Sequence, residues 1–112
     1  MYDDLFFFKR RDTDELTVTS ENKDYTIAVS GRIDTLTAPA LEEEVREIQN
    51  DADQLIIDMR EVEYISSAGM RVIVAAHRAM APKGGLVLRG LTKNVSTIIN
   101  LTGFNKILNI EE

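Results

Sequence analysis

Two neighbouring stretches near the start of the chain alternate hydrophobic and polar residues with a period of two. They lie between Glu15 and Gly31, and many of their apolar positions hold β-branched residues. This alternation is typical of half-buried β-strands. The polar residues Asn22, Lys23 and Asp24 separate the two stretches and predict a turn. We therefore expect a β-hairpin here.

Three later segments repeat apolar residues every three or four positions, as amphipathic helices do. The expected helices are Thr37–Asn50, Ser66–Met80 and a third one marked by the apolar residues of 95–102. Thr37 is a suitable N-cap for the first helix, and Pro39 suits its first turn. Gly103 is expected to end the third helix, because glycine readily adopts the left-handed conformation found there.

The first of these helices combines one apolar face with several acids. Leu41, Val45 and Ile48 fall on a single stripe, which predicts the buried face. Three consecutive acids, Glu42–Glu44, lie near the helix N-terminus, where the helix dipole favours negative charge. A solvated face explains these acids better than a metal-binding cluster does.

Short apolar runs lie between and after the helices. The run within Gln54–Met59 is continuous and predicts a strand that is covered on both faces. Residues 86–88 predict a second buried strand, which ends at Gly90, and residues 107–110 predict a short last strand. Strands that alternate with helices imply βαβ units with right-handed crossovers. The expected fold is therefore α/β, with helices packed on a mixed, mostly parallel sheet of about five strands.

The N-terminal residues have a different character. Leu5–Phe8 are apolar, and the basic run Lys9–Arg11 follows them, with aspartates on both sides. We interpret residues 1–14 as an N-terminal extension or edge strand and the basic run as a solvated segment. A signal peptide has the opposite order, because its positive charge precedes a longer apolar run. The chain has 112 residues and no internal linker, so 1–112 is expected to be a single domain.

Composition narrows the class of protein further. Hydrophobic residues make up 44% and charged residues 29% of the chain, which is typical of a globular domain. The net charge of -6 repels the phosphates of nucleic acids, so binding to DNA or RNA is not expected. The chain has no cysteine and therefore neither disulfides nor thiolate metal sites. No apolar stretch approaches the ~20 residues of a membrane span, and a cytoplasmic protein is the expectation.

Most candidate chemistry has a simple structural explanation. The chain lacks the two phosphate-binding motifs GxxxxGK[ST] and GxGxxG, and no cofactor is expected. Asp58, with Glu61 and Glu63 nearby, can in principle bind a cation, but an ordinary strand-to-helix loop explains their spacing better. His77 shares a helix face with apolar residues. It is expected to be a packed or edge histidine rather than a catalytic base.

One segment is unusual, because residues 64–73 read Tyr-Ile-Ser-Ser-Ala-Gly-Met-Arg-Val-Ile. Ser66 is a good N-cap, which puts Ser67 in the first turn of a helix. The two hydroxyls can mean nothing more than a helix cap, and the pattern alone favours that interpretation. Alternatively, Ser67 is a phosphorylatable serine. A phosphate there faces the positive end of the helix dipole and free backbone N–H groups, so it is compatible with the helix.

This segment resembles the phosphorylation-site motif D-S-[ST]-G-[LM] of the STAS domain family, in particular of the small bacterial anti-sigma factor antagonists. The Gly-Arg-Ile-Asp sequence of Gly31–Asp34 resembles the family's G-x-[LI]-D segment. Residues 84–88 and 101–104 resemble its G-G-x-[LMV]-x-[LV] strand and its [LM]-[ST]-G-[LF] turn. The similarity runs from about Leu16 to Ile110 and implies a STAS fold for nearly the whole chain.

The resemblance also implies roles for single residues. Ser67 takes the position of the phosphoacceptor, and Asp34 that of an acid close to it. Ser66 stands where the family has an aspartate, and Ala68 replaces the second hydroxyl, so the kinase that modifies Ser67 is not identified. The surroundings of the phosphorylation site and the partner-docking surface are expected to consist of Asp34, Ser66, Ala68, Gly69, Met70 and Arg71.

The function that the resemblance implies is partner switching. In this mechanism the unphosphorylated protein binds an anti-sigma factor and so frees a sigma factor. The anti-sigma factor is also a serine kinase of the histidine-kinase-like ATPase type, and it ends the complex by phosphorylating the antagonist. A PP2C-type serine phosphatase restores the unphosphorylated form. The chain is thus expected to be a substrate and a ligand, not an enzyme.

Three alternatives stay open at this point. A STAS protein of this size can instead be a subunit that docks on the ATPase of an ABC-type lipid transporter. Some STAS domains are ligand-sensing domains for nucleotides or lipids, although no phosphate-binding loop supports that role here. A small enzyme is the third alternative, and the sequence supplies no triad, metal set or cofactor motif for it.

Overall fold

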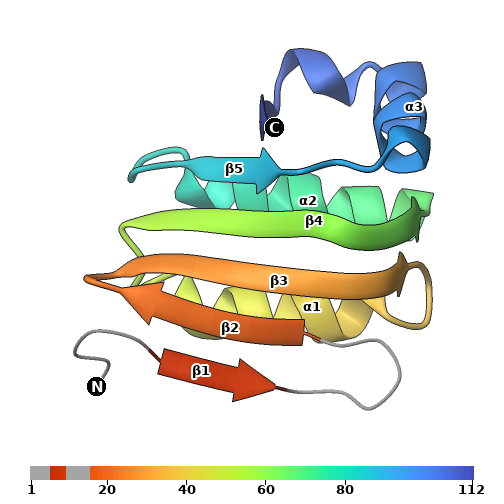
Figure 1. Ribbon diagram of the computed structural model, residues 1–112. Coiled ribbons are helices and arrows are strands. Elements are labelled where there is room, and N and C mark those ends of the chain that lie inside the picture. Colours follow the sequence, from red (N-terminus) through yellow and green to blue (C-terminus); the bar gives the residue numbers. More distant parts are fainter. Residues whose placement is uncertain (1–5, 10–15) are drawn as a thin grey trace.

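The computed structural model describes residues 6–9 and 16–112 of the chain. These residues form a six-stranded sheet whose strands lie side by side in chain order (Figure 1). The strands are β1 (Phe6–Lys9), β2 (Leu16–Glu21), β3 (Asp24–Ile33), β4 (Gln54–Ile65), β5 (Leu86–Arg89) and β6 (Asn109–Glu111). β1, β2 and β3 pair antiparallel, whereas β3 to β6 pair in parallel. The expected mixed, mostly parallel sheet is confirmed.

Three α-helices connect the parallel strands. They are α1 (Ala38–Ile48), α2 (Ser67–Met80) and α3 (Lys93–Thr102), and a short 3-10 helix, η1 (Phe104–Lys106), follows α3. α1 and α2 lie behind the sheet in Figure 1, and α3 lies at its upper right. The hydroxyl of Thr92 donates to the carbonyl oxygen of Val62 at 2.9 Å, which holds the start of α3 against the end of β4.

The predicted hairpin is confirmed, with a turn that is one residue shorter than expected. Asn22 and Lys23 form the turn, with φ angles of 53° and 69°. Asp24 already pairs with Glu21 and opens β3. Two central residues with positive φ match the right-handed twist of the strands they join. This conformation lets β2 and β3 pair without a further loop residue.

The central strand β4 is twice as long as the sequence suggested, because it continues from Met59 to Ile65. Ala28 pairs with Asp58 but Ser30 with Glu61, and a second register shift follows between Gly31 and Arg32, so β4 carries one extra residue at each of two β-bulges. The first bulge lets two charged residues in a row face solvent without ending the strand. The expectation of a strand-to-helix loop around Asp58, Glu61 and Glu63 is therefore wrong.

The expectation that β4 is covered on both faces is also wrong. Leu55 and Ile57 are fully buried on the face that α1 and α2 cover, whereas Ile56 is only half-buried on the other face. Ile56 lies in register between Thr26 of β3 and Val87 of β5. These cross-strand neighbours shield one another, which explains how an apolar run can lie in a strand with one covered face.

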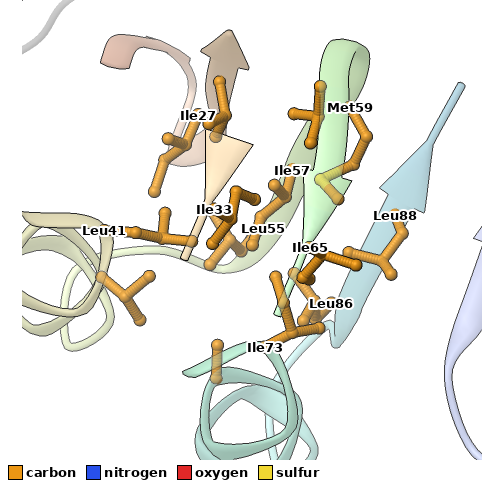
Figure 2. Close-up of a cluster of buried hydrophobic side chains, with 14 of the residues drawn as sticks. Ile27, Ile33, Leu41, Leu55, Ile57, Met59, Ile65, Ile73, Leu86 and Leu88 are labelled. Carbon is orange, nitrogen blue, oxygen red and sulfur yellow. The ribbon is translucent and has the colours of Figure 1, made fainter. Parts of the chain in front are cut away.

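The core fills the space between the sheet and the two helices behind it. Figure 2 shows Leu41 of α1 and Ile73 of α2 pointing toward the side chains of β3, β4 and β5. Leu41, Val45 and Ile48 are all buried, which confirms the predicted apolar stripe. Glu44 is buried as well, so only two of the three consecutive acids face solvent. Glu44 lies three residues after Leu41 and therefore on the packed side of α1.

The four described residues of the N-terminal segment form β1 at the edge of the sheet. Phe6 pairs with Ser20 and Lys9 with Thr17 in an antiparallel ladder. The predictions for Leu5, Arg10 and Arg11 fall outside the described residues, and the single-domain expectation stays a prediction. None of the helices in residues 6–9 and 16–112 has both the length and the apolar character of a membrane span.

Candidate functional site

The unusual serine segment begins α2, as the sequence predicts. Ser66 is the N-cap residue, with extended backbone angles, and its Oγ accepts a hydrogen bond from the backbone N–H of Gly69 at 3.2 Å. This bond satisfies one of the N–H groups that a helix start leaves without an intrahelical partner. The cap interpretation of Ser66 is therefore confirmed.

Ser67 is the first residue of α2, and its side chain is exposed. The position combines an accessible hydroxyl with the positive end of the helix dipole. A phosphate on this hydroxyl would therefore gain from the dipole and from nearby backbone N–H groups, without displacing any buried side chain.

Gly69 holds the start of α2 close to the sheet. A Cβ atom at this position would lie 2.7 Å from both Cγ2 and the carbonyl oxygen of Ile33, and 2.9 Å from Cγ1 of Ile65. Such distances are too short for any larger residue, so the close approach of the helix to β3 and β4 requires glycine. The glycine thereby sets how far Ser67 projects from the edge of the sheet.

Asp34 lies at the same edge of the sheet as the serine segment. Ile33 of β3 is in register with Ile65 of β4, so Asp34 and Ser66 follow directly after a pair of aligned residues. The backbone N–H of Ser66 also donates to the carbonyl oxygen of Ile33 at 2.8 Å. The parallel pairing therefore brings two motifs together that lie more than thirty residues apart in the sequence.

The carboxylate of Asp34 organises the loop that leads into α1. It accepts hydrogen bonds from the backbone N–H groups of Leu36 at 3.0 Å and Thr37 at 3.2 Å, and from Nε of Arg32 at 3.4 Å. Although desolvation alone would raise the pKa of Asp34, these hydrogen bonds lower it below the usual value. Asp34 is thus an anionic side chain with a structural role in the loop.

Thr37 occupies the N-cap position of α1, as expected, but its side chain does not cap the helix. Its hydroxyl lies 2.6 Å from the carbonyl oxygen of Arg32, to which it donates, and it accepts from the backbone N–H of Asp34 at 2.9 Å. The hydroxyl of Thr37 is thus used within the loop before α1, and the backbone N–H of Ala40 donates instead to the carbonyl oxygen of Thr37 at 3.1 Å. Pro39 lies in the first turn of α1, as predicted.

A hollow of about 800 Å³ lies beside Ser67. It is lined by residues of the loop before α1, of α1 and α2, of the end of α3 and of η1: Thr35, Ala38, Pro39, Glu42, Ser67, Ala68, Met70, Arg71, Val72, Val74, Ala75, Arg78, Thr102 and Phe104. Ser67, Ala68, Met70 and Arg71 of the predicted surroundings line it, whereas Asp34, Ser66 and Gly69 do not. Asp34 instead directly follows β3, and Ser66 and Gly69 form the capped start of α2.

Sequence reasoning missed several exposed residues around this hollow. Arg78 lines it and lies on the same helix face as Ser67 and Arg71, which helical spacing could have revealed. Leu36 is 85% exposed and follows Thr35, and Leu101 is 82% exposed and precedes Thr102. Both threonines line the hollow. Their exposure could not be predicted, because both leucines look like core residues in the sequence.

The other candidate groups have structural partners or surroundings. The carboxylate of Asp58 forms an ion pair with Arg60, and its Oδ2 lies 2.7 Å from Nη2 of the arginine. The pKa of Asp58 lies below its usual value, mainly because of this contact. His77 is half-buried, and its Nδ1 is shielded from solvent. Within residues 6–9 and 16–112, no three histidine, aspartate or glutamate side chains come together as a metal site.

Comparisons with known proteins agree with this fold. A family model described as "Mlab, STAS domain" matches residues 16–109. The chain is 33% identical over 105 residues to the anti-sigma-B factor antagonist of Listeria monocytogenes, covering 92% of this chain and 84% of that protein. It is 34% identical over 82 residues to the anti-sigma-F factor antagonist RsfB of Mycobacterium tuberculosis, covering 70% and 67%.

A solved structure gives the same picture. The crystal structure of an anti-sigma factor antagonist from Mycobacterium paratuberculosis matches with a TM-score of 0.81 at 27% identity, covering 93% of this chain and 90% of that one. The mixed sheet, with two helices behind it and a capped serine segment at its edge, defines a small α/β domain of the antagonist type. The chain belongs to the STAS domain family.

Proposed function

We propose that this protein is an anti-sigma factor antagonist that acts by partner switching, with Ser67 as its phosphoacceptor. The carrying observation is that Ser67 stands exposed on the first turn of α2 in a STAS domain whose relatives are named anti-sigma factor antagonists. In this proposal the protein is a binding partner and a kinase substrate, not an enzyme, and it acts in the cytoplasm.

The unphosphorylated form binds an anti-sigma factor and thereby frees a sigma factor. A phosphate on Ser67 adds about -1.5 to -2 charges to the docking surface. Because the helix dipole accommodates this charge, α2 stays folded. A partner that covers Ser67 must instead desolvate the phosphate, and each ~1.4 kcal/mol of that cost lowers affinity tenfold. The switch therefore acts on binding rather than on the fold.

Two enzymes complete the proposed cycle. The anti-sigma factor is itself a serine kinase with a histidine-kinase-like ATPase domain, and a PP2C-type phosphatase removes the phosphate. Ser66 replaces the aspartate that the family motif has before the phosphoacceptor. In this chain Ser66 still provides the helix cap, so the presentation of Ser67 does not depend on the missing acid.

The proposal is tested by incubating the protein with its cognate anti-sigma factor kinase and ATP, followed by peptide mapping. We expect one phosphate on Ser67, none on a Ser67→Ala variant, and full modification of a Thr97→Ala variant, whose exposed hydroxyl lies on α3. A Ser67→Asp variant should bind the kinase much more weakly with an unchanged circular dichroism spectrum. Phosphate on another residue, or an unmodified wild-type protein, contradicts the assignment.

A second candidate function is that of a subunit docking on the ATPase of an ABC-type lipid transporter. The match of residues 16–109 to a family model described as "Mlab, STAS domain" favours it. The two functions predict different partners for the same hollow beside Ser67. An affinity pull-down from the native cell that recovers a histidine-kinase-like ATPase supports partner switching, whereas recovery of an ABC ATPase supports the transporter role.

A further inference from the structure

The exposed face of α2 carries a cation one turn after Ser67. Arg71 lies four residues beyond Ser67, both side chains are exposed, and both line the same hollow. Side chains four residues apart on a helix are neighbours, with about 5–6 Å between their Cβ atoms. Because Cα–Cβ bonds tilt toward the helix N-terminus, the side chain of Arg71 leans toward the turn that holds Ser67.

The guanidinium of Arg71 has no acidic partner among the described residues. Three arginines on other elements are paired: Arg46 with Glu42 at 3.3 Å, Arg60 with Asp58 at 2.7 Å and Arg89 with Glu111 at 2.7 Å. The remaining charged groups lining the hollow are Glu42, which already pairs with Arg46, and Arg78. An unpaired arginine beside a serine is notable in a chain whose net charge is -6.

We propose that Arg71 binds the phosphate of phosphorylated Ser67 in an intramolecular ion pair. The inference rests on the proposed phosphorylation of Ser67 and describes how that site is regulated. A guanidinium binds phosphate oxygens through two parallel hydrogen bonds. The order also fits, since an acidic group N-terminal to a basic one at this spacing is the stronger arrangement on a helix.

This pair gives phosphorylation two effects on the docking surface. It adds a dianion at the start of α2, and it removes the free cation that the unphosphorylated surface offers to an acidic group of a partner. The phosphate also folds along α2 toward the hollow and occupies part of its opening. A partner carboxylate that binds Arg71 in the unphosphorylated form is then repelled by the phosphate, and the guanidinium of Arg71 is no longer available to it.

The test uses protein with phosphoserine installed at position 67 during translation, so it does not depend on any kinase. The second ionisation of the phosphate is followed by 31P NMR titration in wild type, Arg71→Gln and Arg78→Gln. Arg78 is the matched control, because it is also exposed and unpaired but lies about 16 Å from Ser67 along the helix axis, against about 6 Å for Arg71. Circular dichroism of each variant confirms that the fold is kept.

We expect the phosphate of the Arg71→Gln variant to titrate roughly 0.2–0.4 pH units higher than in wild type, because the lost cation no longer favours the dianion. Arg78→Gln should match wild type, and 1 M salt should remove most of the difference. An unchanged titration in Arg71→Gln, or an equal shift in Arg78→Gln, overturns the ion pair. Failure of a kinase to modify Ser67 contradicts only the proposed function.

Discussion

The backbone N–H of Ser66 donates to the carbonyl oxygen of Ile33 at 2.8 Å, and this bond fixes the start of α2 against the end of β3. It continues the parallel ladder between β3 and β4 by one residue beyond their last aligned pair. As a result, the helix starts where the sheet ends, and its first side chain projects into solvent. The position of Ser67 is therefore a property of the sheet as much as of the helix.

The helix cap can be tested with neighbouring serines. Replacing Ser66 with alanine should lower the free energy of unfolding by about 1 kcal/mol, because the N–H of Gly69 loses its acceptor. Ser67→Ala, one residue further, should change it by less than about 0.5 kcal/mol, since an exposed side chain is removed. Urea unfolding monitored by circular dichroism measures both.

A third variant sharpens this experiment. Ser66→Asp restores the aspartate of the family motif and should retain wild-type stability, because aspartate caps helices as well as serine does. If Ser66→Ala and Ser67→Ala destabilise the protein equally, the assignment of the cap to Ser66 is wrong.

Gly69 should not tolerate even a methyl group. Inside a helix, alanine normally stabilises relative to glycine by about 1 kcal/mol. Here the added Cβ would overlap Ile33 and Ile65, so Gly69→Ala should instead destabilise the protein by about 1–3 kcal/mol. The amide NMR signals of Ser66 and Ser67 should shift as the helix start moves. A stabilised variant would show that α2 does not approach the sheet as closely as described.

The packing of α2 on the sheet gives a contrast between two aliphatic residues. Ile73 is fully buried, so Ile73→Ala should cost about 2–5 kcal/mol of unfolding free energy. Leu101→Ala removes a side chain of the same size that is 82% exposed, and should change stability by less than about 0.5 kcal/mol. Chemical denaturation of both variants provides the measurement. A large loss in Leu101→Ala would indicate that this leucine is covered in solution.

Acid should weaken the folded state partly through Asp58. Its pKa is lowered from the usual 3.8, chiefly by the side chain of Arg60, although burial opposes the shift. A carboxyl group whose pKa is lower in the folded than in the unfolded state stabilises the fold at pH values above its unfolded-state pKa. This contribution disappears as the pH falls through the folded-state pKa. The stability of wild type should therefore drop as the pH falls below about 4.

The control for this acid effect is another aspartate. Between neutral and acidic pH, the free energy of unfolding should drop less in Asp58→Asn than in wild type. In Asp53→Asn it should drop as in wild type, since Asp53 forms no ion pair among the described residues. Urea midpoints at pH 7, 4 and 3 give the comparison. If the urea midpoint falls equally with pH in Asp58→Asn and in wild type, a stabilising Asp58–Arg60 pair is contradicted.

The sequence by itself determined the element order, the α/β class and the serine-capped start of the second helix. These features depend on local periodicity and capping, which the pattern around Ser66 and the stripe through Leu41 and Val45 carry directly. The family motifs extended this to the candidate roles of Ser67 and Asp34, which stay predictions.

Only the tertiary structure decided what depends on contacts between distant segments. The length of β4 follows from its pairing with β3 across two bulges, and the burial of Glu44 follows from how α1 lies on the sheet. The same holds for the free guanidinium of Arg71 beside Ser67 and for the exposure of Leu36. Periodicity along one chain reports which face a residue occupies, but only the packed fold determines what covers that face.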